Sequence, residues 1–201
     1  MPLIDFDLIA PVYNKAMYVA EKCCLREWRR KLISRVKGKR VLEVGIGTGA
    51  NIPFYPPHIE LYGLDSSRKM LGQMPDEYVQ RLAGVFISSA DKIPVENSFF
   101  DTALSTFVFC NLEAPEEVAK EMVRVVRPGG QLLFLEHTSP CNTMLKASFK
   151  ALEKVTVPLM HEYFTRDVRK FLEKLPVKKV HEERSNSGIL LLVEYEVVKS
   201  I

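Results

Sequence analysis

A strand that runs directly into three closely spaced glycines is the part of this sequence best suited to chemistry. Residues 41–49 read VLEVGIGTG, an apolar strand followed by Gly45, Gly47 and Gly49. Glycine has no Cβ, so it reaches backbone angles closed to other residues and lets a ligand lie against the main chain. A strand that ends in such a turn is typical of the nucleotide-binding corner of an open α/β sheet.

The acid beside this turn bears on the kind of ligand. Glu43 lies just before the glycines, where a carboxylate suits a positively charged ligand and repels a pyrophosphate. S-adenosylmethionine (SAM) carries a sulfonium and an ammonium, so Glu43 favours SAM. A nicotinamide dinucleotide is the alternative: Gly45, Gly47 and Ala50 also satisfy the G-x-G-x-x-G/A pattern, and Asp65 lies at the distance expected of a ribose-binding acid.

Four further segments follow in a fixed order. Residues 61–71 read as a strand ending in an acid before a helix start, and 85–91 as a third strand with its closing turn. Residues 100–109 read as a fourth strand, and 125–135 as a helix end, a Pro-Gly-Gly turn and a fifth strand. Together the five segments resemble the class I SAM-dependent methyltransferase family over roughly residues 40–137. Within it, the chain is most similar to the branch of ubiquinone/menaquinone C-methyltransferases, phospholipid N-methyltransferases and methyltransferase-like thiol enzymes.

The alternation of strands and helices, together with this resemblance, predicts an α/β fold. We expect a doubly wound, mainly parallel, seven-stranded sheet of the Rossmann-like methyltransferase type, with an antiparallel last strand and an N-terminal helical lid. Residues 1–201 read as a single domain. A helical lid with a basic amphipathic segment is expected over 1–38, a cofactor-binding core over 39–137, and acceptor-side helices and closing strands over 138–201.

Several local signals place elements in the second half of the chain. A helix is expected to begin at Pro115, because proline suits the first turn and the acids that follow complement the positive helix end. It is expected to stop at the Pro-Gly-Gly turn, where proline cannot continue it. Further helices are predicted over 144–156 and from Thr165 to about 172, with closing strands over 177–183 and 188–198.

The resemblance also implies which residues hold SAM. In such enzymes a strand-end acid accepts both ribose hydroxyls, here Asp65, and a later acid accepts from the adenine amine, here Asp91. The glycines admit the methionine portion, Glu43 reaches its amino group through water, and Phe107 faces the methionine arm. The implied cofactor-binding set is Glu43, Gly45, Gly47, Gly49, Asp65, Ser66, Met70, Asp91 and Phe107.

The acceptor side is predicted less fully. The fourth strand ends in Phe109-Cys110-Asn111, without the histidine that many small-molecule relatives carry there. His137, directly after the fifth strand, is the best candidate for a general base, because strand carboxyl ends in such sheets face the ligand crevice; a structural role is the alternative. Tyr13 lies in an F-D-x-x-A-x-x-Y element that, in the quinone and phospholipid enzymes, belongs to the lid; it could equally be a core aromatic. His161 is a weaker candidate.

These residues predict methyl transfer from SAM, with S-adenosylhomocysteine as the product. The expected acceptor is small and lipophilic or membrane-associated: a phospholipid amine, a quinol or a thiol. Residues 144–163 support this, because they carry more apolar side chains than a helix covering one sheet edge needs and could form an acceptor pocket. The alternatives are a SAM-binding protein without transfer activity and an NAD-dependent oxidoreductase.

Charge and composition limit the partners. Lys22, Arg26, Arg29 and Arg30 lie on a predicted amphipathic helix, which suits contact with an anionic membrane, although a solvated helix face explains them equally well. With a net charge of only +3, no nucleic-acid partner is expected. The acidic start and the lack of a long apolar run predict a cytoplasmic protein, peripheral to the membrane at most. The spacing of Cys23, Cys24, Cys110 and Cys141 predicts no metal site.

Overall fold

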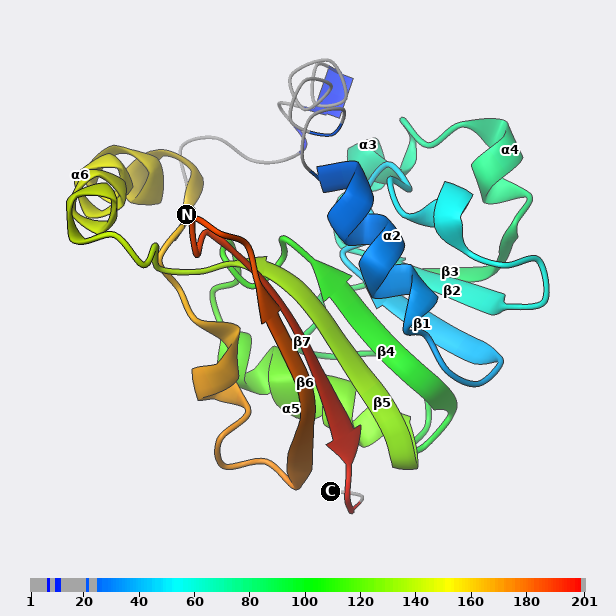
Figure 1. The fold of residues 1–201 in the computed structure, drawn as a ribbon. Coiled ribbons are helices and arrows are strands. Elements are labelled where there is room, and N and C mark those ends of the chain that lie inside the picture. Colours follow the sequence, from blue (N-terminus) through cyan, green and yellow to red (C-terminus); the bar gives the residue numbers. More distant parts are fainter. Residues whose placement is uncertain (1–6, 8–9, 12–20, 22–24, 200–201) are drawn as a thin grey trace.

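The computed structural model describes residues 7, 10–11, 21 and 25–199. Its centre is a sheet of seven strands in the order β3-β2-β1-β4-β5-β7-β6 (Figure 1). The strands are β1 Arg40–Val44, β2 Glu60–Asp65, β3 Leu82–Ile87, β4 Phe100–Thr106, β5 Val126–His137, β6 Val177–Arg184 and β7 Leu190–Val197. The chain reverses its order in the sheet between β1 and β4, so a ligand crevice is expected at their carboxyl ends.

Strand direction confirms the predicted fold class. Strands β1 to β5 pair in parallel, whereas β7 pairs antiparallel with both β5 and β6. The apolar run at residues 189–193, predicted to be a buried strand, forms much of β7, which inserts between its two neighbours and is buried over most of its length. The antiparallel last strand is the one expected of the predicted methyltransferase-type sheet.

Helices cover both faces of the sheet. Helix α5, Pro115–Val125, packs behind it with Val118, Met122 and Val123 buried. Helix α2, Arg26–Ser34, lies in front, with Leu32 and Ile33 in a second core cluster (Figure 1). The short helices α3, Arg68–Leu71, and α4, Asp76–Val79, follow β2. Pro115 opens α5 as predicted, with two acids in its first turn.

The Pro-Gly-Gly segment does not form the predicted turn. Strand β5 begins at Val126 and continues through residues 128–130, with a register shift opposite Phe100. Gly129 has φ +73°, and a Cβ on Gly130 would lie 2.7 Å from the Asp101 carbonyl oxygen. The glycines therefore permit an irregularity within a strand that lies close against its neighbour.

The predicted helix at Thr165 is also absent. The segment forms a short 3-10 helix at Val168–Phe171, and Asp167 caps it by accepting a hydrogen bond from the Arg169 amide. Thr165 instead donates through its amide and its hydroxyl to the Glu153 carboxylate, at 2.6 and 3.1 Å. Glu153 belongs to α6, Thr143–Met160, which is longer than the predicted helix and begins at an Asn142 cap.

Helix α6 does not form the wall of the cofactor cavity. It follows the carboxyl end of β5 and stands out from the body of the molecule (Figure 1). Met144, Leu152 and Val155 are exposed, whereas Leu145, Phe149, Val157 and Leu159 are half-buried, so part of the apolar surplus predicted to line a pocket lies on the outside. None of the described helices is long and apolar enough to cross a membrane.

The basic N-terminal helix differs from its prediction in one residue. Arg26 and Arg30 are exposed, as a solvated or membrane-facing surface requires, but Arg29 is only 4% exposed. Arg29 points into the protein with Leu32 and Ile33 and so cannot take part in a surface contact. Lys22, Tyr13, Cys23 and Cys24 lie outside the described residues.

Candidate cofactor-binding site

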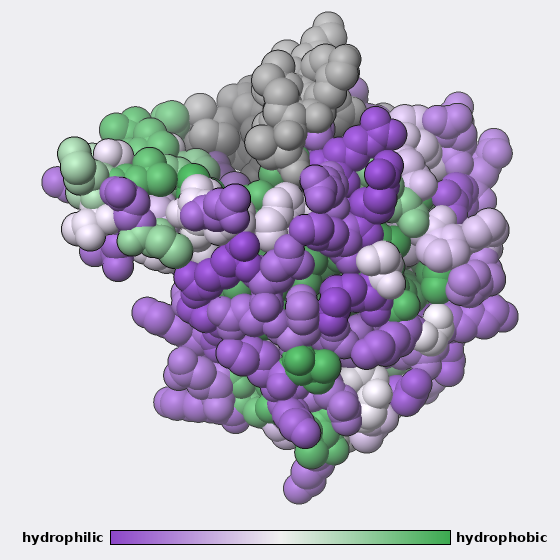
Figure 2. Space-filling view, in the orientation of Figure 1, coloured by the Kyte–Doolittle hydropathy of each residue, from purple (hydrophilic) through white to green (hydrophobic). Residues whose placement is uncertain are grey.

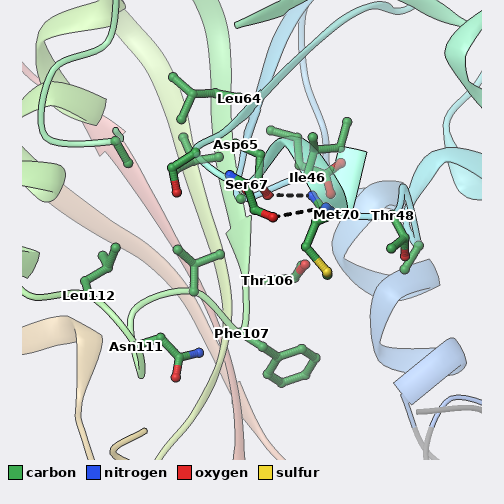
Figure 3. A pocket seen from close by; sticks show the side chains of 18 of the residues that line it. Ile46, Thr48, Leu64, Asp65, Ser67, Met70, Thr106, Phe107, Asn111 and Leu112 are labelled. Atoms are coloured by element: carbon green, nitrogen blue, oxygen red, sulfur yellow. Dashed lines mark hydrogen bonds between the residues drawn. The ribbon is translucent and has the colours of Figure 1, made fainter. Parts of the chain in front are cut away.

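A cavity of about 480 Å³ lies at the carboxyl ends of the central strands. Its walls come from the ends of β1, β2 and β4, from the loops after β1 to β4 and from single residues of α2, α3 and the N-terminal segment. Figure 3 shows Asp65, Ser67 and Met70 gathered on one side, with Phe107 and Asn111 across from them. Of the predicted set, the cavity is lined by Glu43, Gly45, Gly47, Asp65, Ser66, Met70 and Phe107.

The glycine turn is shaped by β2 beside it. The Gly45 and Ile46 amides both donate to the Leu64 carbonyl, at 2.7 and 3.1 Å. Gly45 has φ +68°, and a Cβ there would lie 2.3 Å from Val108 Cγ2. Gly47 has φ +52° and faces the cavity, where a Cβ would lie 3.9 Å from an Asp65 carboxylate oxygen. The missing side chain at Gly47 leaves that space to a ligand.

Gly49 has a different role from the one predicted. It does not line the cavity, and a Cβ there would lie 2.8 Å from Ile52 Cδ1 and 3.3 Å from Met74 Cγ. With φ +82°, Gly49 lets the chain turn into the 3-10 helix Ile52–Phe54 and allows close packing there. Its contribution to the site is therefore indirect.

Asp65 is held by the backbone of two turns. Its carboxylate accepts from the Gly47 amide and the Ser67 amide, both at 2.8 Å. Burial raises the pKa of this carboxyl, against the effect of the backbone bonds. Each carboxylate oxygen has a second lone pair, so Asp65 can still accept from two ligand hydroxyls.

Ser67 caps α3 by accepting from the Met70 amide, and donates to the Asp7 carboxylate. This places Ser66 and Met70 at the cavity wall beside Asp65. The cavity is also lined by residues 88–90 after β3, but Asp91 is exposed and does not line it. The structure does not bring Asp91 to the other predicted cofactor residues, so its contact with adenine stays a prediction.

A buried polar network closes the other end of the cavity. Glu43 accepts from the Asn51 side-chain amide and the Tyr55 hydroxyl, both at 2.8 Å. Burial raises the pKa of Glu43 to about 7, while these hydrogen bonds and the Arg29 charge act in the opposite direction. Arg29 donates to Asn51 at 3.0 Å and to Thr106 at 3.1 Å, and forms a 2.6 Å ion pair with Glu21.

Arg29 is a charged cavity residue that is absent from the predicted cofactor-binding set. The sequence-based prediction places it with Lys22, Arg26 and Arg30 on the basic side of an amphipathic helix. The buried stripe instead includes Leu25, Leu32 and Ile33, and Arg29 lies between them at helical spacing. A base that shares the apolar side of a helix with leucine and isoleucine is a sequence signal of a functional or paired charge.

The acceptor side is marked by a row of rings. Phe107 follows β4 with φ 57°, an uncommon and strained conformation for a side chain of this size. Its ring centroid lies 4.8 Å from that of His137, which lies 5.6 Å from Phe164. Phe164 in turn lies 5.9 Å from Phe149 on α6. This aromatic row leads from the cavity to α6.

His137 does not line the cavity but lies behind Phe107. Burial lowers its pKa to about 4, so the imidazole is neutral at physiological pH. Its Nδ1 atom is buried without a partner among the described residues. His161 ends α6 with φ 57° and contacts the Tyr163 ring, away from the cavity walls.

Comparison with known proteins bears on which of the two predicted cofactors this cavity holds. Residues 42–134 match a protein family described as the methyltransferase domain. A phosphatidylethanolamine N-methyltransferase of Cereibacter sphaeroides is 33% identical over 135 residues, which cover 63% of this chain and 65% of that protein. A thiol S-methyltransferase (TMT1B) of Homo sapiens is 34% identical over 123 residues, 55% of this chain and 50% of that protein.

The chain is similar to class I SAM-dependent methyltransferases, with residues 42–134 matching the methyltransferase domain. A ubiquinone/menaquinone biosynthesis C-methyltransferase (UbiE) of Pseudomonas paraeruginosa is 28% identical over 178 residues, which cover 83% of this chain and 70% of that protein. A solved SAM-dependent methyltransferase of Thermotoga maritima shares the fold with a TM-score of 0.73 over 96% of this chain and 98% of that one, at 17% identity. This chain spans only half to two thirds of the length of the first two relatives.

The family decides between the two predicted cofactors in favour of SAM, and the described residues fit it. The cleared space at Gly47 beside the Asp65 carboxylate suits a ribose, and no Cβ obstructs it. Arg29 and Glu43 both line the cavity, and with Glu43 ionised the pair has the opposite charges that an amino-acid zwitterion requires.

We expect Asp65→Asn to weaken SAM binding by about tenfold or more, because an amide cannot accept from both ribose hydroxyls and each unpaired group costs about 1–3 kcal/mol. Isothermal calorimetry with SAM and with adenosine measures this, and both ligands should lose affinity. Asp76→Ala, an exposed acid on α4, is the control. Unchanged affinity in Asp65→Asn contradicts the ribose assignment.

Arg29→Met is expected to affect binding of the methionine portion of SAM and to leave binding of the adenosine portion unchanged. Loss of a charged donor at the methionine end should weaken SAM by about tenfold or more, while adenosine, which lacks the methionine portion, keeps its affinity. Retained adenosine binding also shows that the variant is folded. Arg26→Met removes an exposed arginine of the same helix and should change neither ligand. Equal loss of SAM and adenosine would point to a general structural role for Arg29.

His137→Phe should reduce the loss of unfolding free energy that the wild type shows as the pH falls below about 6.5. The folded-state pKa of about 4 lies below the ordinary value of 6.5, so the unfolded chain binds a proton more readily. Stability contributed by the neutral ring is therefore lost as pH falls from about 6.5 to about 4, by about 2 kcal/mol at pH ~5. Urea unfolding at about pH 7.5 and about pH 5 compares the wild type with His137→Phe and with the exposed-site control His58→Asn. Equal losses in the wild type and His137→Phe contradict this assignment.

Proposed function

We propose that this methyltransferase moves the methyl group of SAM to a small lipophilic acceptor: a phospholipid amine, a quinol or a thiol. SAM supplies an electrophilic methyl group and leaves as S-adenosylhomocysteine. The observation that carries the proposal is the aromatic row Phe107, His137, Phe164 and Phe149 beside the cofactor cavity. An apolar approach lined by rings suits an acceptor with an alkyl or aromatic body.

Two unpartnered polar atoms lie near the inner end of this row. The Asn111 side-chain oxygen is buried without a partner among the described residues, and so is His137 Nδ1. Asn111 lines the cavity, and His137 lies behind Phe107. Buried polar atoms need hydrogen bonds, so an acceptor amine, hydroxyl or thiol would satisfy what the folded chain leaves open. These atoms would orient the nucleophile.

The cofactor would be held at both ends by residues already in place. Asp65 would accept from the ribose hydroxyls, Arg29 would bind the methionine carboxylate and Glu43 its ammonium. Phe107 would separate the methionine arm from the acceptor side. Because the transferred carbon must lie in line between donor and acceptor, these contacts act by fixing orientation, which contributes about 7–11 kcal/mol in favourable cases.

A strong general base is not part of this proposal. The lowered pKa of His137 makes it a poor proton acceptor at neutral pH, and the pKa of the buried Cys110 thiol is raised well above its ordinary range by burial. Acceptors that are nucleophilic without help, such as a free amine or a thiolate, therefore suit the site best. The same observation favours the second candidate, a SAM-binding protein without transfer activity.

The names of the relatives agree with a lipophilic acceptor. The three relatives are named as a phosphatidylethanolamine N-methyltransferase, a thiol S-methyltransferase and a ubiquinone/menaquinone biosynthesis C-methyltransferase. Lipid and quinone acceptors reside in bilayers, so we propose a cytoplasmic protein that contacts an anionic membrane peripherally.

An acceptor panel tests the proposal. Full-length protein with radiolabelled SAM is assayed against phosphatidylethanolamine, a demethylated quinol, an alkyl thiol and a water-soluble catechol. We expect labelled product from one of the first three, and loss of that product in Phe107→Ala because the wall between donor and acceptor is removed. Methylation of the catechol alone contradicts the lipophilic acceptor. SAM binding without any product supports the second candidate.

A further inference from the structure

The outer side of α6 is an unusual surface for a water-exposed helix. Met144 is 81% exposed, Val155 61% and Leu152 46%, and the three lie on one side of the helix at i, i+8 and i+11. Figure 2 shows hydrophobic surface gathered over α6 at the left of the view. The other exposed large apolar residues of the described chain lie on other elements, in the segment 79–87 and on β6 and after β7.

A row of lysines runs along a different flank of α6. Lys146, Lys150 and Lys154 are exposed and follow one another at four-residue steps, so they lie in a row along the helix. The one acid of Thr143–Met160, Glu153, is turned inward to Thr165. The outer surface of α6 therefore combines apolar side chains with uncompensated positive charge.

The inner side of α6 is held by contacts with residues 162–165, and these contacts fix the orientation of its outer side. Phe149 contacts the Phe164 ring, Glu153 accepts from Thr165, and Thr156 donates to the Glu162 carbonyl at 3.0 Å. The helix follows the carboxyl end of β5, the same edge of the sheet at which the cofactor cavity lies. A surface bound to the outer side of α6 would therefore lie next to the aromatic row.

We propose that α6 is the membrane-docking element of this protein and that its outer side binds an anionic lipid surface. Met144, Leu152 and Val155 enter the boundary between headgroups and acyl chains, and the row of lysines pairs with anionic headgroups. Charge complementarity selects this partner: a row of lysines on the same helix as an exposed apolar side matches a negative interface, whereas a protein–protein interface of this kind is depleted in lysine. The inference rests on the proposed lipophilic acceptor for its purpose, since docking here lets the acceptor pass from the bilayer along Phe149 and Phe164.

Vesicle binding without SAM tests the surface independently of catalysis. Full-length protein is co-sedimented with phosphatidylglycerol/phosphatidylcholine vesicles and with pure phosphatidylcholine vesicles. We expect binding to the anionic vesicles that weakens as salt rises. Met144→Glu/Val155→Glu and Lys146→Glu/Lys150→Glu should each weaken it by about tenfold or more.

Matched controls make the same chemical changes elsewhere. Val180→Glu and Lys178→Glu alter an exposed valine and an exposed lysine of β6, and should bind vesicles as the wild type does. Calorimetric SAM binding is expected to be unchanged in every variant, which shows that the fold and the cofactor site are intact. Failure to methylate any lipid would count against the proposed function and would leave the vesicle result standing.

A tryptophan placed on α6 distinguishes it from the basic face of α2. Trp28 on α2 is the single tryptophan of the chain. In Trp28→Phe/Val155→Trp, emission should shift to the blue and be quenched by brominated lipids. A response from Trp28 in the wild type, without one from residue 155 in the variant, would overturn the proposal in favour of α2. So would loss of a dimer, rather than loss of vesicle binding, in Met144→Glu/Val155→Glu.

Discussion

A carboxylate buried in the middle of the sheet is the constraint on which the cofactor site depends. Glu43 lies on β1 and is 1% exposed. A buried charge is tolerated only where hydrogen bonds or an opposite charge replace water. Here Tyr55 and Asn51 come from the turn after the glycines, and Arg29 comes from α2 and reaches Glu43 through Asn51. One acid thus fixes the turn and the N-terminal helix around one end of the cavity. The buried pKa of about 7 means that a cationic ligand would favour the ionised form and release a proton on binding.

A second buried acid, Glu136, holds the segment after β4 that carries Phe107. Glu136 on β5 accepts from the Ser105 hydroxyl at 3.0 Å and from the Val108 amide at 3.2 Å, and burial raises its pKa to about 7. These bonds hold the segment after β4 in which Phe107 takes its strained backbone conformation. The Phe107 amide also donates to the Leu135 carbonyl at 2.9 Å. Strain of about 1–3 kcal/mol persists only where the surroundings determine the geometry. The Phe107 ring is therefore held by β5, and His137 of the same strand contacts it.

The parts of this site that the sequence predicts are those set by short-range chemistry. A glycine at positive φ, or an acid that accepts from amides a few residues along the chain, is determined by its immediate neighbours. Gly45, Gly47 and Asp65 are of this kind, and they lie where they were expected. The doubly wound, mainly parallel sheet could be predicted too, because alternating strands and helices leave few right-handed parallel arrangements. The antiparallel β7 could be predicted from the two closing strands over 177–183 and 188–198, which are close enough in sequence to pair as a hairpin.

The sequence-based predictions that were wrong share one cause. Each concerns residues whose environment is set by a distant part of the chain. Gly129 and Gly130 read as a turn, but the closeness of Asp101 on β4 makes them a strand irregularity. Arg29 reads as a surface base until Asn51 and Thr106, far along the sequence, appear as its partners. The apolar surplus of α6 has the same explanation. An amphipathic pattern shows that a helix has an apolar side, but only the fold shows whether the rest of the chain covers it. In the described structure Met144, Leu152 and Val155 are exposed, and a molecule that covered them would gain the stabilisation of removing them from water.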